Sequence, residues 1–170
     1  SVAGSVQPYA GQGTCAKCEA GKFVNESAQT ACFDCAAGSY CEAGASAPLP
    51  CKEGTFSSEP GLASKGQCTS CPVGASCSTR SLLPNLCSPG TVQPQQGQGS
   101  CAKCFAGRYQ EAEGHTACDV CSAGTYCAYG AAAPTLCAAG SYSAAIGNAE
   151  QANCSTCPEG ASCSKGSESP

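Results

Sequence analysis

Apolar and polar residues along this chain follow neither the 3.6-residue period of an amphipathic helix nor the extended alternation of long strands. Glycine or proline interrupts every long run, which disfavours helices. The recurring feature is a cysteine, two small or polar residues and a glycine, often with an aromatic residue two positions after the glycine. We therefore expect short two-stranded hairpins joined by turns, with little or no helix.

The C-x-x-G motif divides the chain into units of 16, 17 or 20 residues. A shift of 86 residues places every cysteine from Cys15 to Cys77 on another cysteine, which gives two sequence repeats, 1–86 and 87–170. Ser1 stands at the position that Cys87 occupies in the second repeat. Both ends fall inside a unit, so we expect the chain to be a segment of a longer array. The opening cysteines of the units are Cys18, Cys35, Cys51, Cys71, Cys87, Cys104, Cys121, Cys137 and Cys157.

Composition indicates that cysteine must hold these units together. The hydrophobic share of 42% consists mostly of alanine and cysteine, and the chain has no methionine or tryptophan. Burial of such small side chains does not offset the conformational entropy lost on folding. The 19 cysteines therefore predict disulfides, which are typical of an oxidising compartment and of secretion. Zinc is the alternative for Cys15, Cys18, Cys32 and Cys35, but the remaining cysteines do not divide into regular sets of four.

A sequential pairing scheme joins each opening cysteine to the next cysteine. It leaves Cys15 without a partner, because the position that would pair with it holds Ser1. We expect Cys15 to be free or to bind a cysteine upstream. A crossed scheme, with Cys32 bound to Cys41 and Cys35 to Cys51, stays open because spacing does not fix connectivity. The sequential pairs are Cys18–Cys32, Cys35–Cys41, Cys51–Cys68, Cys71–Cys77, Cys87–Cys101, Cys104–Cys118, Cys121–Cys127, Cys137–Cys154 and Cys157–Cys163.

The glycine of each motif predicts a turn with positive φ, which would lay the following side chain over the disulfide. The aromatic residues at that place are Phe23, Tyr40, Phe56, Tyr109, Tyr126 and Tyr142. A row of sugar-binding or base-stacking rings is the alternative interpretation of these residues.

The pattern C-x-x-G-[TS]-[YF] at Cys35, Cys51, Cys121 and Cys137, together with C-x-x-C and C-x5-C steps, resembles the ephrin-receptor-like cysteine-rich repeat. That family is similar to the modules of tumour-necrosis-factor receptors and to furin-like regions. The resemblance implies an elongated extracellular module held by successive disulfides. It carries no ligand-contact residue over to this chain.

Residues for chemistry are few. His115 is the single histidine, and Cys15 lies in no visible electropositive setting, so we expect no enzymatic activity, cofactor or metal. Asn25 and Asn153 begin N-glycosylation sequons, although Cys154 occupies the middle of the second. The net charge of −4 has no basic run behind it, and the chain has no hydrophobic span, so neither nucleic-acid binding nor membrane insertion is expected.

Two function classes remain. The first is a non-catalytic structural segment of an extracellular filament or surface appendage, such as a flagellar hair (mastigoneme), at a cell or ciliary surface. It would assemble with copies of itself or with other filament proteins and carry glycans. The second is a receptor or adhesin stalk. Repetition favours the filament, and Leu82, Leu83 and Leu86 form the densest apolar cluster for local packing or for contact with another chain.

Overall fold

A computed structural model describes residues 1–11 and 13–170. In this part of the chain the regular structure consists of two-residue strands, paired into antiparallel hairpins, and two short 3-10 helices. The expected tandem array of small disulfide-rich hairpins with little helix is confirmed. The paired strands are β1 (Ser5–Val6) with β2 (Ala16–Lys17), β3 (Lys22–Phe23) with β4 (Phe33–Asp34), β5 (Ser39–Tyr40) with β6 (Leu49–Pro50), β7 (Thr55–Phe56) with β8 (Thr69–Ser70), β9 (Ala75–Ser76) with β10 (Asn85–Leu86), β11 (Thr91–Val92) with β12 (Ala102–Lys103), β13 (Arg108–Tyr109) with β14 (Asp119–Val120), β15 (Thr125–Tyr126) with β16 (Thr135–Leu136) and β17 (Ser141–Tyr142) with β18 (Ser155–Thr156), and the 3-10 helices are η1 (Lys65–Gln67) and η2 (Gln151–Asn153).

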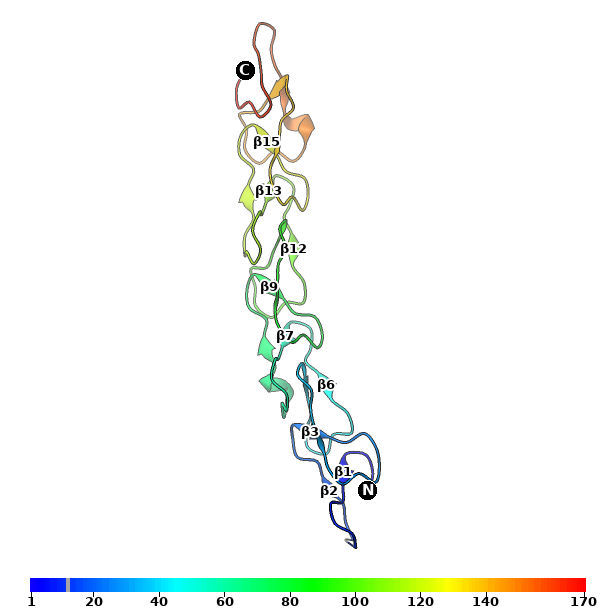
Figure 1. Cartoon of the computed structure of the whole chain (residues 1–170). Helices are drawn as coiled ribbons and strands as arrows, with labels where there is room; N and C mark the ends of the chain where they lie inside the picture. Colours follow the sequence, from blue (N-terminus) through cyan, green and yellow to red (C-terminus); the bar gives the residue numbers. More distant parts are fainter. Residues whose placement is uncertain (12) are drawn as a thin grey trace. The chain divides into compact units, whose positions relative to one another are not determined.

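The described residues fall into two compact units, and the hairpin of β9 and β10 contributes to both. The first comprises Ser1–Pro72, Ser76–Asn85 and Gln96–Ser100, and the second comprises Val73–Ala75, Leu86–Gln95 and Cys101–Pro170. In the first unit β3, β6 and β7 follow one another in chain order, and in the second unit β12, β13 and β15 do so (Figure 1). Sequence neighbours are therefore also neighbours in space inside a unit.

The disulfides join the same nine pairs as the sequential scheme, one for each opening cysteine. Cys32 is bound to Cys18 and Cys35 to Cys41, so the crossed alternative is not the arrangement found. The closed loops have sequence separations of 6, 14 or 17 residues. In the loop-entropy model, closure of such loops stabilises the fold by about 2 to 3 kcal/mol each.

Sulfur forms most of the buried interior. Eight opening cysteines are at most 1% exposed, whereas few aliphatic side chains, chiefly Val6, Val24 and Val92, are buried with them. A chain with so few large apolar residues retains its fold because the disulfides supply the stability that apolar burial does not. These buried opening cysteines are Cys18, Cys35, Cys51, Cys71, Cys87, Cys104, Cys121 and Cys137.

Four backbone hydrogen bonds join each hairpin to the next, and two kinds of glycine take part. The opening glycine is the glycine of the C-x-x-G motif, and the loop glycine lies in the turn of the following hairpin. At the junction of 104–120 with 121–136 the bonds are Gly107 N–H to Cys127 C=O (2.8 Å), Cys121 N–H to Gly107 C=O (3.0 Å), Gln110 N–H to Ala131 C=O (3.2 Å) and Gly130 N–H to Cys104 C=O (2.8 Å).

The same four-bond pattern recurs along the described chain, with one difference at its first junction, where Ala28 N–H donates to Ser1 Oγ. The bonds use backbone atoms and are therefore independent of most side chains. The sequence analysis did not indicate this hydrogen-bond ladder.

The opening glycines have positive φ, as predicted, and Gly107 shows why no side chain fits there. Its φ is +83°, and a Cβ atom at this residue would collide with the backbone carbonyl of Gly147, which lies two hairpins further along. Packing in the array therefore extends beyond the adjacent hairpin. The contact explains the fixed C-x-x-G spacing better than turn formation alone.

The loop position was missed by sequence analysis. Gly130 has φ +75°, and Ala28 and Arg80 adopt the same left-handed conformation at the corresponding places, with φ of +61° and +65°. Arg80 N–H still donates to Cys51 C=O at 2.9 Å. An L residue is thus accepted at the loop position, although left-handed backbone costs it about 1 kcal/mol or more.

Candidate functional site

The two residues considered for catalysis, His115 and Cys15, belong to different compact units. His115 is exposed in a turn, and its carbonyl accepts the N–H of Gln93 at 3.1 Å. Cys15 is the one free cysteine of the described residues, half-buried, with its Sγ 3.8 Å from Gln7 Oε1. In residues 1–11 and 13–170 no group of three or more His, Cys, Asp or Glu side chains is arranged to hold a metal ion.

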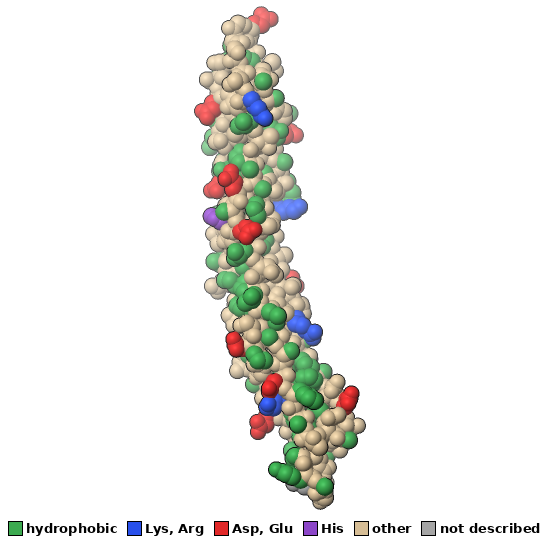
Figure 2. Space-filling view, viewed as in Figure 1, with side chains coloured by type: hydrophobic (Ala, Val, Ile, Leu, Met, Phe, Trp, Pro, Cys, Tyr) green, Lys and Arg blue, Asp and Glu red, His purple; other side chains and the backbone are tan. Residues whose placement is uncertain are grey.

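Charged side chains are sparse on the face of the molecule that Figure 2 shows. Acidic and basic side chains are scattered among uncharged ones on the face shown in Figure 2. A surface depression of about 440 Å³ is lined by residues that include Gln7, Tyr9 and Thr30, and no acidic group, histidine or thiol lines it.

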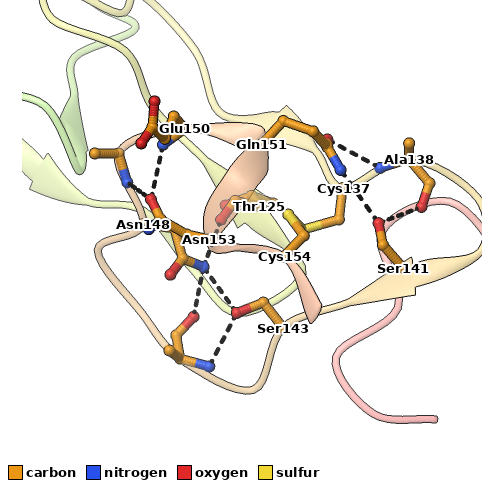
Figure 3. Close-up of a disulfide and its surroundings, with 12 residues drawn as sticks. Thr125, Cys137, Ala138, Ser141, Ser143, Asn148, Glu150, Gln151, Asn153 and Cys154 are labelled. Carbon is orange, nitrogen blue, oxygen red and sulfur yellow. Dashed lines mark hydrogen bonds between the residues drawn. A yellow bond between two sulfur atoms is a disulfide. The ribbon is translucent and has the colours of Figure 1, made fainter. Parts of the chain in front are cut away.

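The hairpin that contains the Cys137–Cys154 disulfide has a network of side-chain hydrogen bonds (Figure 3). Asn148 is 8% exposed, and its Nδ2 donates to Ser143 Oγ at 2.9 Å and to Thr125 C=O at 3.1 Å. The latter bond reaches the preceding hairpin. Asn148 therefore reinforces one junction of the ladder with a side chain, which sequence analysis did not anticipate.

Asn153, the second sequon asparagine, belongs to the same hairpin and has a structural task. Its Oδ1 accepts the N–H groups of Ala149 and Glu150, both at 3.0 Å, at the start of η2 (Figure 3). In the first repeat Gln67 makes the same pair of bonds, with Ala63 and Ser64. The position holds an amide in both repeats because this turn needs its acceptor oxygen.

Asn25, the first sequon asparagine, has a different environment. It is exposed, and its side chain has no hydrogen-bond partner among the described residues. The backbone beside it is held firmly, since Val24 is fully buried and its N–H donates to Ala45 C=O at 3.2 Å. The amide group of Asn25 thus projects into solvent from a fixed loop.

The second repeat carries an exposed aromatic pair. The rings of Phe105 and Tyr129 lie 6.5 Å apart between centroids, tilted by 53°, and the residues are 75% and 62% exposed. Lys103 Nζ lies 5.8 Å from the centre of the Tyr129 ring. Glu19 and Ala43 occupy the positions of the two rings in the first repeat. The two aromatic residues are 24 positions apart in the chain, and the fold brings their rings together.

The predicted leucine cluster is solvent-exposed. Leu82 and Leu83 are 51% and 65% exposed in the first compact unit, and Leu86, also exposed, belongs to the second. Leu82 also packs near Gly38, where an added Cβ would meet its Cδ2 atom. The local-packing interpretation therefore holds for part of Leu82, and the exposed remainder is available for contact with another chain.

Comparison with protein-family models and with curated proteins finds no match for this chain. In the part of the chain that the structure describes, neither 3-10 helix approaches the length and apolarity that crossing a membrane requires. The features of this chain that bear on its function are therefore the geometry of the hairpins, the disulfides and the exposed side chains.

Proposed function

We propose that this chain is a non-catalytic structural segment of an extracellular filament or surface appendage, in which disulfide-closed hairpins assemble with other chains. The observation that carries the proposal is the recurrence of one disulfide for each opening cysteine and one four-bond pattern per junction. Such a scaffold is held by backbone and sulfur. Its surface side chains are therefore free to vary, as at Phe105 and Glu19.

Resistance to extension is the mechanical property that such a scaffold would contribute. Each disulfide removes its loop, of up to 17 sequence positions, from the length of chain that force can pull out. The remaining segments lengthen only after the hydrogen bonds of a junction break. A structural element exposed to tension benefits from both properties, whereas a catalytic site gains nothing from them.

The disulfides also bear on location. Nine bridges in a chain of this length are typical of extracellular proteins, because cytosolic thiols are kept reduced. A cell-surface or flagellar position, as in the hairs called mastigonemes, is part of the proposal. The proposed partners are copies of the same chain, other filament proteins and glycans, with no nucleic acid and no direct insertion into membrane.

The test is electron microscopy of native, unreduced material released from the cell surface and labelled with an antibody against residues 1–170. Labelled fibres with a regular axial period are the expected result. A parallel sample treated with reductant should lose the fibres if the disulfides maintain them. Labelled single particles attached to a membrane-anchored domain, without fibres, would contradict the proposal.

A receptor or adhesin stalk is the second candidate, and the exposed pair of Phe105 and Tyr129 favours it. Exposed aromatic side chains are enriched at sites of recognition. The first repeat supplies a matched control, because Phe105→Glu with Tyr129→Ala gives the second repeat the residues of the first. Loss of binding to intact cells in this double variant, with folding retained, would support the stalk over the filament.

A further inference from the structure

The two sequon asparagines occupy different positions in the fold, and the 86-residue repeat allows each to be compared with its counterpart. Asn25 corresponds to Glu111, and Asn153 corresponds to Gln67. An amide is retained at the second position and not at the first. This difference separates an asparagine with a structural task from one without.

Asn153 is accounted for by its hydrogen bonds. Its Oδ1 caps the turn that begins η2, and Gln67 does the same in a stretch that contains no sequon. The next residue, Cys154, is bound to Cys137 (Figure 3). The Asn-Cys-Ser sequence therefore follows from two structural requirements, an amide cap and a disulfide, that have nothing to do with glycosylation.

Asn25 has no structural task of this kind. Its side chain is exposed without a partner, and Glu111 at the equivalent place is also exposed. The turns at 25–30 and 111–116 have the same local structure, so neither side chain determines the fold of its loop. Ser27, which completes the sequon, is exposed as well. A large substituent on the Asn25 amide would extend into solvent.

We propose that Asn25 carries an N-linked oligosaccharide and that Asn153 does not. In the reaction the Nδ2 atom of Asn25 would lose a proton and form a bond to the anomeric carbon of the oligosaccharide. The bond from that carbon to the oxygen of a lipid diphosphate donor breaks, and the lipid diphosphate leaves with the electron pair. The inference shares with the proposed function the premise of secretion, but it does not depend on assembly into a filament.

Peptide mapping separates the two sites cleanly. After reduction and alkylation, trypsin cleavage at Lys22 and Lys52 releases 23–52, and cleavage at Arg108 and Lys165 releases 109–165. The test uses the chain secreted by a eukaryotic host, with its nine disulfides verified by non-reducing mass spectrometry. Treatment with peptide N-glycosidase converts a glycan-bearing asparagine to aspartate, which marks the attached position.

The expected result is a glycan that the glycosidase removes from peptide 23–52 and an unmodified peptide 109–165. Asn25→Gln and Ser27→Ala each abolish the modification, whereas Ser27→Thr preserves it. Asn153→Gln, which copies the first repeat, leaves the glycan content unchanged. These variants lie on exposed side chains, so each is expected to be secreted and oxidised as the parent is.

An unmodified peptide 23–52 from a secreted chain with all nine disulfides would overturn the proposal, and so would a glycan on 109–165. Neither outcome bears on filament formation, because secretion and oxidation are established in the same sample. Conversely, a glycosylated chain that forms no fibres would contradict the proposed function and leave this inference intact.

Discussion

Replacement of an opening glycine is predicted to damage the array far more than replacement of a loop glycine. Gly107 has φ +83° and faces the backbone of Gly147, whereas Gly130 has φ +75° and faces the flexible Lys103 side chain at 3.2 Å from an added Cβ. Both glycines belong to the second compact unit. Gly107→Ala and Gly130→Ala therefore share the conformational strain and differ in the steric conflict.

The magnitudes follow from the contacts. Left-handed backbone costs an alanine about 1 to 2 kcal/mol, and the less flexible unfolded chain returns about 0.4 to 1 kcal/mol. Gly130→Ala is thus expected to lower the free energy of unfolding by about 1 kcal/mol. Gly107→Ala must also displace backbone and weaken the bonds to Cys127 and Cys121, at about 1 kcal/mol each, for a total near 3 kcal/mol.

Guanidinium unfolding with intact disulfides, followed by circular dichroism, measures both changes. Hydrogen exchange of the Cys127 and Gly107 region reports whether the loss is local to that junction. Gly66→Ala is the control, because Gly66 lacks positive φ and a Cβ there would meet only Ser64 Oγ at 3.8 Å. Equal destabilisation by Gly107→Ala and Gly130→Ala would refute the assignment of a packing role to the opening glycine.

Three further predictions concern single positions. Arg80→Gly should raise the free energy of unfolding by about 0.5 kcal/mol, because the left-handed strain that is relieved in the folded state exceeds the free energy lost through the greater flexibility of the unfolded chain. A lower free energy of unfolding for this variant, measured with guanidinium, would contradict the prediction. Asn153→Ala should cost about 1 kcal/mol, as loss of a helix cap does, whereas Asn153→Gln should be near neutral by thermal unfolding. In the variant Ser1→Cys the new cysteine should form a disulfide with Cys15, as Cys87 does with Cys101 in the second repeat. This bond should remove the free thiol and stabilise the folded state by about 3 kcal/mol. A thiol that still reacts with a maleimide in the oxidised variant would show that the two residues do not approach.

Other changes leave the scaffold unaltered and probe only the surface. Lys22 and Asp34 form an exposed ion pair across β3 and β4, so its removal is expected to change stability by well under 1 kcal/mol. Phe105→Glu and Tyr129→Ala should also change stability little, because both rings are largely exposed and their removal takes away little buried area. Variation of this kind between repeats is consistent with a fold held by disulfides and backbone.

The sequence by itself determined the hairpin units and their order, and it offered the sequential pairing of their cysteines, whereas the choice between sequential and crossed pairing came from the structure. It did so because each disulfide is local, so that C-x-x-G spacing carries nearly all of the information about topology. The positive φ at the opening glycines was also predictable, since a turn must follow each opening cysteine. The shortage of large apolar residues also indicated that disulfides hold the fold, because the chain cannot form a large hydrophobic core.

Only the tertiary structure decided how one hairpin meets the next. The ladder joins backbone atoms, whose partners have no side-chain signature in the sequence. The loop position was not recognised in the sequence, because a left-handed turn is usually inferred from a glycine. Two hairpins have Ala28 and Arg80 at that position instead. The meeting of Phe105 with Tyr129 and the capping role of Asn153 likewise depend on distances that chain separation does not reveal. Local disulfides can be predicted from the spacing of the cysteines, whereas the packing of one hairpin on the next depends on how their backbones align in three dimensions.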